Sequence, residues 1–212
     1  MIVSLVSASL LGVDAYVVDI EIDVSGGLPE FRFVGLAAPA IKEGASRVRS
    51  ALKNCGQELP AKRVTVNLAP ADRKKDSVCF DLPIALGLAA AHGLLPMDGL
   101  RDLLVLGELG LDGTVRPVRG VLAATALAKQ RGLRGVLVPK ACASEATLIP
   151  GIEVFAVAHL AEVFSVRDSG GELPRVAPLG VLAPRWPASV DFAQVRGQAA
   201  ARRAIEVAVA GG

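Results

Sequence analysis

The clearest pattern in the chain is a strand, a charged loop and an apolar helix in direct succession. Residues 64–68 alternate between apolar and polar, as in a strand with one buried face, and Pro70 ends the run. Residues 82–91 are apolar on every side, which is typical of a helix buried all round, and Asp81 stands where an N-cap belongs. Residues 71–79 are therefore expected to form a charged loop at a helix N-terminus, where proteins bind anions or activate nucleophiles.

The remaining periodicity predicts intermixed strands and helices. Residues 39–53 repeat apolar positions at helical spacing, and Lys42, Arg49 and Lys53 line the flank of this helix. The glycines within residues 25–28 predict a hairpin between two strands. Further strands are expected at 2–9, 15–24, 30–34, 103–106, 135–138 and 153–156, and helices at 121–130 and 160–164. We therefore expect an α/β fold of the α+β two-layer sandwich type, with a mixed sheet packed with helices.

The composition changes near residue 167, which suggests a domain boundary. Residues 168–188 hold four prolines and three glycines with little periodicity, as a linker would. A turn or short strand and then a helix over 198–210 follow within residues 189–212. Because a domain does not usually begin in the last 24 residues, we expect one domain over 1–167, a linker, and the first segment of a second domain belonging to a longer protein.

Composition narrows the cellular setting. The 212 residues are 52% hydrophobic with a formal net charge of +2, so the total charge does not indicate a partner. Three widely spaced cysteines favour neither a disulfide framework nor a zinc cluster. The apolar start lacks a basic region before it, and no apolar run reaches the roughly 20 residues that a membrane helix needs. These features predict a cytoplasmic protein without a membrane contact.

The distribution of charge is more informative than its sum. Residues 1–38 hold five acids against one base, whereas residues 39–75 hold nine bases against three acids. Such asymmetry suits a DNA surface, the complementary faces of a ring of subunits, or simply a solvated face. The residues predicted to contact DNA or a neighbouring subunit are Lys42, Arg49, Lys53, Arg73, Lys74 and Lys75.

Four long stretches resemble one known family. They are FRFVGLAAPAIKEGASRVRSALKNCG, NLAPAD followed by FDLPIAL, GELGLDGTVRPVRG, and DFAQVRGQAAARRAIEVAVAGG. Over nearly the whole chain they are similar to the ComM or YifB proteins, also called magnesium-chelatase-like AAA+ proteins. The resemblance implies an N-terminal domain like the proteolytic domain of Lon, within a superfamily named after a ribosomal-protein domain, and then the start of an AAA+ ATPase module.

The next question is whether this segment can bind ATP by itself. No G-x-x-x-x-G-K-[ST] phosphate loop occurs in the 212 residues, so this segment alone is expected neither to bind ATP appreciably nor to hydrolyse it. Val195, Gly197 and Gln198 resemble the segment that lines the adenine in AAA+ modules, and they form a partial site at most. Only the full-length protein is expected to bind ATP and magnesium, and the resemblance implies that it assembles into a hexameric ring.

The Lon resemblance raises the question of peptidase activity. It places Cys79 at the position of Lon's nucleophilic serine and Leu122 at the position of its lysine base. A cysteine at a helix N-terminus can be nucleophilic, but neither His92 nor His159 is an obvious base. We therefore expect no catalytic residue in this segment. A cysteine variant of a Lon-type peptidase remains the enzymatic alternative, and a magnesium-chelatase motor subunit is another.

The glycine-rich stretch over residues 107–120 does not have the spacing of a nucleotide-binding motif. Asp112-Gly113 predicts a turn, with Arg116 and Arg119 placed to pair with Glu108. A metal site at Glu108 and Asp112 is the alternative, although no third ligand is evident and no metal is expected.

The family resemblance implies a motor that drives branch migration of DNA in natural transformation, in which this domain serves ring assembly, DNA contact, or both.

Overall fold

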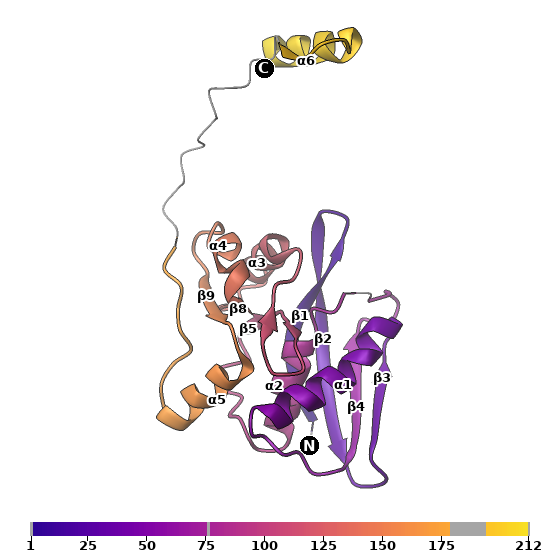
Figure 1. The fold of residues 1–212 in the computed structure, drawn as a ribbon, viewed down its shortest axis with the longest axis vertical. Coiled ribbons are helices and arrows are strands. Elements are labelled where there is room, and N and C mark those ends of the chain that lie inside the picture. The colour runs from indigo at the N-terminus through magenta and orange to yellow at the C-terminus, as the bar shows by residue number, and fades with distance from the viewer. Residues whose placement is uncertain (1, 76, 179–193, 212) are drawn as a thin grey trace. The chain divides into compact units, whose positions relative to one another are not determined.

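The computed structural model describes residues 2–75, 77–178 and 194–211, which divide into two units between residues 179 and 180 (Figure 1). The first unit contains a mixed sheet with the strand order β3-β4-β2-β1-β5-β8-β9. Its strands are β1 (Ile2–Leu11), β2 (Asp14–Ser25), β3 (Glu30–Val34), β4 (Arg63–Ala69), β5 (Leu103–Val105), β8 (Gly135–Pro139) and β9 (Glu153–Val157), and β6 (Glu108–Leu109) pairs separately with β7 (Val115–Arg116).

Helices pack on this sheet to complete the expected α/β fold. In chain order they are α1 (Pro39–Asn54), α2 (Asp81–Ala91), α3 (Val121–Gln130), α4 (Ala143–Ala146) and α5 (Leu160–Ser169), with a short 3-10 turn at Lys140–Cys142. The β1–β2, β2–β4 and β6–β7 pairs are antiparallel and the remaining pairs are parallel. The predicted mixed sheet and its layered arrangement with helices are therefore confirmed.

The hairpin predicted at residues 25–28 is wrong. In the structure β4 lies between β2 and β3, and β3 runs parallel to β4. β4 pairs with residues Asp19 to Ser25 of β2 and so takes the place beside β2 that a hairpin would give to β3. The glycine-rich connection from β2 to β3 therefore passes over β4. The actual hairpin joins β1 to β2 through Gly12 and Val13, with Gly12 at a left-handed φ of 65°.

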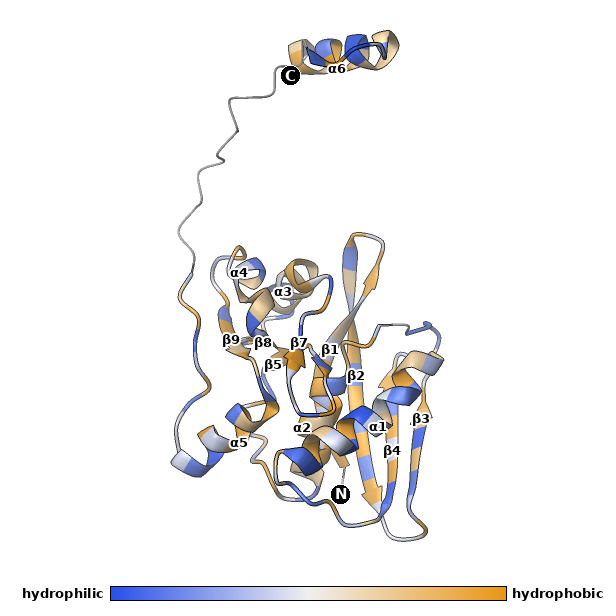
Figure 2. Cartoon of the chain, in the orientation of Figure 1, coloured by the Kyte–Doolittle hydropathy of each residue, from blue (hydrophilic) through white to orange (hydrophobic). Residues whose placement is uncertain are grey.

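Helix α2 forms the centre of the core, as its apolar sequence predicted. Its residues from Asp81 to Ala90 are all buried, and a Cβ added at Gly87 would lie 2.6 Å from Ile22 Cδ1 and 3.1 Å from Leu5 Cδ1. The helix is therefore packed closely against β1 and β2. Figure 2 shows α2 as apolar along its length, whereas α1 alternates between hydrophilic and hydrophobic segments.

The opposite face of the same strands carries acidic side chains. Ile20 and Ile22 in β2 are fully buried toward α2, and the alternate residues Asp19 and Glu21 are exposed. Because successive strand residues point to opposite faces, the two carboxylates face away from the helices. Asp19 and Glu21, two of the five acids counted in residues 1–38, thus lie on the side of the sheet opposite α2.

A buried ion pair joins α1 to α2. Arg47 Nε donates to Asp81 Oδ2 at 2.7 Å and Arg47 Nη2 to Asp81 Oδ1 at 3.1 Å, and the backbone N–H of Leu109 donates to Oδ2 at 3.3 Å. Asp81 is 1% exposed, and Gly44 leaves room for its carboxylate beside α1. The predicted N-cap role of Asp81 is therefore wrong: α2 begins at Asp81 after Phe80, and the carboxylate binds another helix instead of its own backbone.

The first unit continues past the boundary expected at residue 167. Helix α5 runs to Ser169, and the next segment lies along β9, where Val176 N–H donates to Val154 O at 2.8 Å and Ala156 N–H to Pro174 O at 3.3 Å. These hydrogen bonds attach the start of the expected linker to the edge of the sheet. Residues 179–193, which include the rest of that linker and most of the expected entry strand, lie outside the described residues.

The second unit contains one described helix, α6 (Ala199–Gly211), close to the predicted 198–210. Its hydrophobic residues Ile205, Val207 and Val209 are exposed. Among the described residues no helix is long and apolar enough to span a bilayer.

Substituting Arg47 is expected to destabilise the fold strongly. Arg47→Ala leaves the Asp81 carboxylate buried without its cation, a change that typically costs about 3–5 kcal/mol. Arg49→Ala, two residues along the same helix on its exposed side, is expected to change the free energy of unfolding by less than about 1 kcal/mol, since it loses only a surface contact with Phe31. Urea unfolding of both variants checks the difference, and equal losses would contradict a structural role for the ion pair.

Candidate functional site

Lys75, predicted to contact DNA or a subunit, is buried instead. Its side chain is fully inaccessible, and Nζ donates to the carbonyl oxygens of Gly35, at 3.1 Å, and Pro70. Its backbone N–H donates to Leu36 O at 3.2 Å and its carbonyl accepts from Ala38 N–H at 2.9 Å. Burial lowers the pKa of Lys75. This lysine therefore ties the loop before α2 to the connection between β3 and α1, and it is not part of a basic surface.

Arg73 and Lys74 remain exposed in the same loop. The Arg73 guanidinium lies 4.9 Å from the centre of the Tyr16 ring, and the Tyr16 hydroxyl donates to Lys74 O at 3.3 Å. The aromatic ring on β2 therefore positions the loop and leaves the Lys74 amine directed to solvent.

Lys42, Arg49 and Lys53 form an exposed row on α1, which we call the basic stripe. They are separated by seven and four residues, which places them on one face of a helix with 3.6 residues per turn. All three are exposed, and Ile41, Val48 and Leu52 take the buried face. The Arg49 guanidinium lies 5.2 Å from the centre of the Phe31 ring, which holds it in place over β3.

Cys79 lies just before α2, in an apolar environment that disfavours a nucleophile. It is 3% exposed, and its Sγ donates weakly to Ala8 O at 3.5 Å. Burial raises the pKa of the Cys79 thiol to about 12, which leaves almost no thiolate at neutral pH. The cavity beside it measures only about 10 Å³. The thiol is therefore protonated and has no room for a peptide substrate.

Leu122, which the Lon resemblance was expected to align with the lysine base, lies in a different environment from Cys79. Leu122 in α3 is 40% exposed, and its backbone N–H donates to Glu145 Oε1 at 2.8 Å. Leu122 lines a separate shallow cavity together with Val13, whereas Leu10 fills the space over Gly120 beside Cys79. Leu122 therefore cannot act as a base for the Cys79 thiol, because its side chain is apolar and lines a different cavity.

The stretch from β6 to β7 is a turn. Asp112 Oδ1 accepts from the backbone N–H of Thr114 at 3.0 Å and from its hydroxyl at 2.7 Å, and Gly113 has a φ of 95°. Arg116 pairs with Glu108 at 3.3 Å, as expected, whereas Arg119 makes no ion pair within the described residues. The hydrogen bonds from Thr114 lower the pKa of Asp112. Among all the residues that the structure describes, no group of three His, Cys, Asp or Glu side chains is placed to hold a metal.

The three residues expected near an adenine lie just before α6. Gly197 and Gln198 have left-handed φ values of 73° and 52°, and Gln198 O accepts from Arg202 N–H at 2.9 Å to start the helix. Val195 O accepts from Arg202 Nη1 at 3.2 Å. This geometry describes a helix entry, and nucleotide contact through it stays a prediction.

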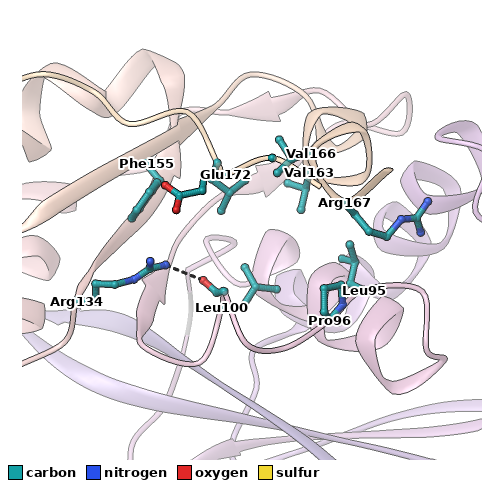
Figure 3. Close-up of a pocket in the computed structure, with 12 residues that line it drawn as sticks. Leu95, Pro96, Leu100, Arg134, Phe155, Val163, Val166, Arg167 and Glu172 are labelled. Atoms are coloured by element: carbon teal, nitrogen blue, oxygen red, sulfur yellow. Dashed lines mark hydrogen bonds between the residues drawn. The ribbon is translucent and has the colours of Figure 1, made fainter. Parts of the chain in front are cut away.

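Among the cavities that were not anticipated from the sequence are two with arginines in their lining. One, of about 260 Å³, lies between α5, β9 and the segment before β5 (Figure 3). Its arginines are already engaged, since Arg134 donates to Gly99 O at 3.0 Å and Arg167 pairs with Asp168. The other measures about 390 Å³ and lies at the C-terminal end of α1, where it includes Arg49 and Lys53 of the basic stripe.

Comparison with known proteins places the chain in a family. A family model described as subunit ChlI of Mg-chelatase matches residues 20–142, more than half of the chain. The competence protein ComM of Haemophilus influenzae is 38% identical over 208 residues, which cover 97% of this chain and 41% of ComM. The uncharacterized protein YifB of Escherichia coli is 37% identical over 202 residues, or 95% of this chain and 39% of YifB.

A more distant similarity links the chain to a protease. Lon protease 2 of Bacillus subtilis is 28% identical over 145 residues, covering 65% of this chain and 26% of that protein. The chain thus spans about two fifths of the length of the ComM and YifB relatives that it matches.

The buried thiol predicts a pH-dependent effect of Cys79→Ser. The folded state keeps the thiol proton up to a pKa of about 12, against an ordinary value of 9.0, so the thiol's contribution to stability is full below pH 9 and is lost as pH rises toward 12. We expect Cys79→Ser, which does not titrate, to cost about 1–2 kcal/mol at pH 7 and progressively less above pH 9. Urea unfolding across this range measures it, and a cost independent of pH would contradict the buried thiol.

The burial of Lys75 predicts a contrast with its neighbour. Lys75→Met leaves the carbonyls of Gly35 and Pro70 without this donor and is expected to cost about 1–3 kcal/mol. Lys74→Met, with an exposed side chain, is expected to stay within about 0.5 kcal/mol of the wild type. Thermal unfolding of the pair tests this, and matching midpoints would show that Lys75 is not a structural tie.

Proposed function

This chain belongs to the ComM/YifB family of Mg-chelatase-like proteins, and we propose that it supplies the non-catalytic, DNA-contacting domain of an ATP-driven motor of that family. The Haemophilus relative is named as a competence protein. We propose the same setting here, with a hexameric ring that moves branched DNA, and with ATP and magnesium bound by a module outside these residues.

The observation that carries the DNA role is the basic stripe on α1. Lys42 and Lys53 are eleven residues apart, so they span roughly 16 Å along the helix axis at 1.5 Å per residue. Measured along the axis of a DNA duplex, that length corresponds to about five nucleotides of one strand at roughly 3.4 Å of axial rise each. An exposed row of three cations can therefore follow one strand backbone and attract it without reading sequence.

A peptidase role has less support. The nucleophile position holds a buried, protonated thiol, and the cavity beside it is close to the volume of one water molecule. The described residues likewise offer no side-chain cluster for a metal, so nothing in the site favours a chelatase reaction. We therefore propose that this domain binds and positions DNA, and that ATP is hydrolysed in the ATPase module.

Subunit contact is the second candidate role, and one observation favours it. The exposed carboxylates Asp19 and Glu21 lie on the face of the sheet opposite α2, so the domain has acidic and basic surfaces on different sides. Complementary surfaces of this kind can join head to tail in a ring. Reversing the charges of the basic stripe distinguishes this role from DNA contact.

We expect the triple reversal Lys42→Glu, Arg49→Glu and Lys53→Glu to weaken DNA binding by the 212-residue chain. Non-specific binding at physiological salt should have a Kd of roughly 10⁻⁴–10⁻⁶ M, and each lost phosphate contact should reduce the salt slope by about 0.9. The matched control reverses Arg101, Arg131 and Lys140, which are equally exposed on other elements. Fluorescence anisotropy with duplex and single-stranded DNA over a salt series measures both variants.

The outcomes separate the two roles. DNA contact predicts a loss for the α1 variant alone, equal for all DNA sequences. If both triple variants lose the same affinity, only total charge matters and the stripe is not the site. An unchanged isotherm for the α1 variant, together with impaired ring assembly of the full-length protein, would replace DNA contact by subunit contact.

A further inference from the structure

We propose that the cavity at the C-terminal end of α1 holds one unpaired nucleotide of a DNA strand, with its base inside and its phosphate at the rim. We call it the basic cavity. It lies between α1, the connection from α1 to β4, and the end of α2, and it measures about 390 Å³. This is within the usual range of small-ligand sites, roughly 300–1,000 Å³. Its lining includes Arg49, Lys53, Lys62, Leu59, Leu88 and His92.

The rim of the basic cavity attracts an anion. Arg49, Lys53 and Lys62 face a single acid in the lining, Glu58. Within the described part of the chain, the side-chain ammonium groups of Lys53 and Lys62 take part in no ion pair or hydrogen bond, so both are available to a ligand. In the cavity of Figure 3, by contrast, both arginines already have partners. A phosphate at this rim would meet the two free ammonium groups of Lys53 and Lys62.

The interior of the basic cavity suits a flat apolar body better than a bare ion. Leu59, Val64 and Leu88 contribute to its wall. Nucleobases commonly stack on arginine planes or on imidazole rings, and Arg49 and His92 supply one of each.

His92 adds a hydrogen-bond acceptor without a partner. Its Nδ1 lies 2.9 Å from Leu88 O, and because a carbonyl oxygen only accepts, Nδ1 carries the proton. In the neutral ring Nε2 is then an acceptor. This atom is buried and has no hydrogen-bond partner among the residues that the structure describes. His92 is one of the residues that line the cavity, so a ligand N–H that reaches this nitrogen would satisfy it.

One ligand class combines these requirements. A nucleotide carries a phosphate, a flat ring and an N–H donor on its base edge, since A, C, G and T each have one. It could be a free nucleotide or part of a strand. We favour the strand because Arg49 and Lys53 belong to both the cavity and the basic stripe, so a strand on α1 would reach the cavity directly. The inference thus rests on the proposed DNA contact.

The test uses oligonucleotides of equal charge with and without bases. Anisotropy measures binding of the 212-residue chain to a labelled 15-nucleotide oligothymidine and to the same backbone with abasic sites throughout. We expect the wild type to bind the normal oligonucleotide about fivefold more tightly or better. Ala61→Trp, which fills the cavity, and His92→Phe, which removes the acceptor, should abolish that preference and leave abasic binding within about twofold. Ser165→Trp on α5 is the matched control.

Each other result overturns a defined step. Equal binding of both oligonucleotides by the wild type would overturn the basic cavity while leaving DNA contact by the stripe intact. Binding of neither would overturn the proposed function itself. A base preference that survives Ala61→Trp would place the base elsewhere. Competition by thymidine monophosphate at the same concentration as the oligonucleotide would show that the ligand is a free nucleotide and not a strand.

Discussion

The buried ion pair between Arg47 and Asp81 fixes the position of α1, and with it the surface that the proposed function uses. Burial raises the pKa of Asp81, and the hydrogen bonds from Arg47 oppose that shift, so the carboxylate depends on its partner to remain charged. The same hydrogen bonding raises the pKa of Arg47. Because a buried pair contributes little net stability but is costly to break, it acts chiefly by allowing one arrangement of the helices.

That arrangement orients α1 with respect to the sheet. Arg47 points inward to Asp81 and Arg49, two residues later, points outward over Phe31. A rotation of α1 that moved the basic stripe would therefore break the ion pair. Gly44 contributes because a Cβ at that position would meet Asp81 Oδ1 at 2.5 Å. The rigid presentation of three cations thus follows from a contact on the other side of the same helix.

The loop before α2 lacks the open, polar surroundings that a catalytic site needs. The Cys79 thiol is buried, Leu10 fills the space over Gly120, and the Lys75 amine donates to backbone carbonyls. Each contact increases packing or hydrogen bonding where an enzyme would need an open, polar pocket. The basic cavity and the basic stripe lie instead on α1 and its continuation, so the proposed binding surface and Cys79 are on different elements.

Local sequence pattern predicted the features that depend on periodicity. The strands, the helices and the alignment of Lys42, Arg49 and Lys53 all follow from spacing along the chain. Features set by long-range contacts were missed. The insertion of β4 between β2 and β3 depends on pairing across about 40 residues, the burial of Lys75 depends on carbonyls at Gly35 and Pro70, and the unpartnered nitrogen of His92 depends on the tautomer fixed by Leu88. Charge alone did not separate Arg47, which is paired, from Arg49, which is exposed.

The most direct test of this account is to map where a DNA strand touches the domain. Amide signals of the ¹⁵N-labelled 212-residue chain can be followed by NMR during titration with a single-stranded oligonucleotide. The account predicts shifts along the exposed side of α1 and at residues 57–62 and His92, with little change around Cys79. Shifts confined to the neighbourhood of Cys79 and Gly120, or to the acidic face at Asp19 and Glu21, would contradict it.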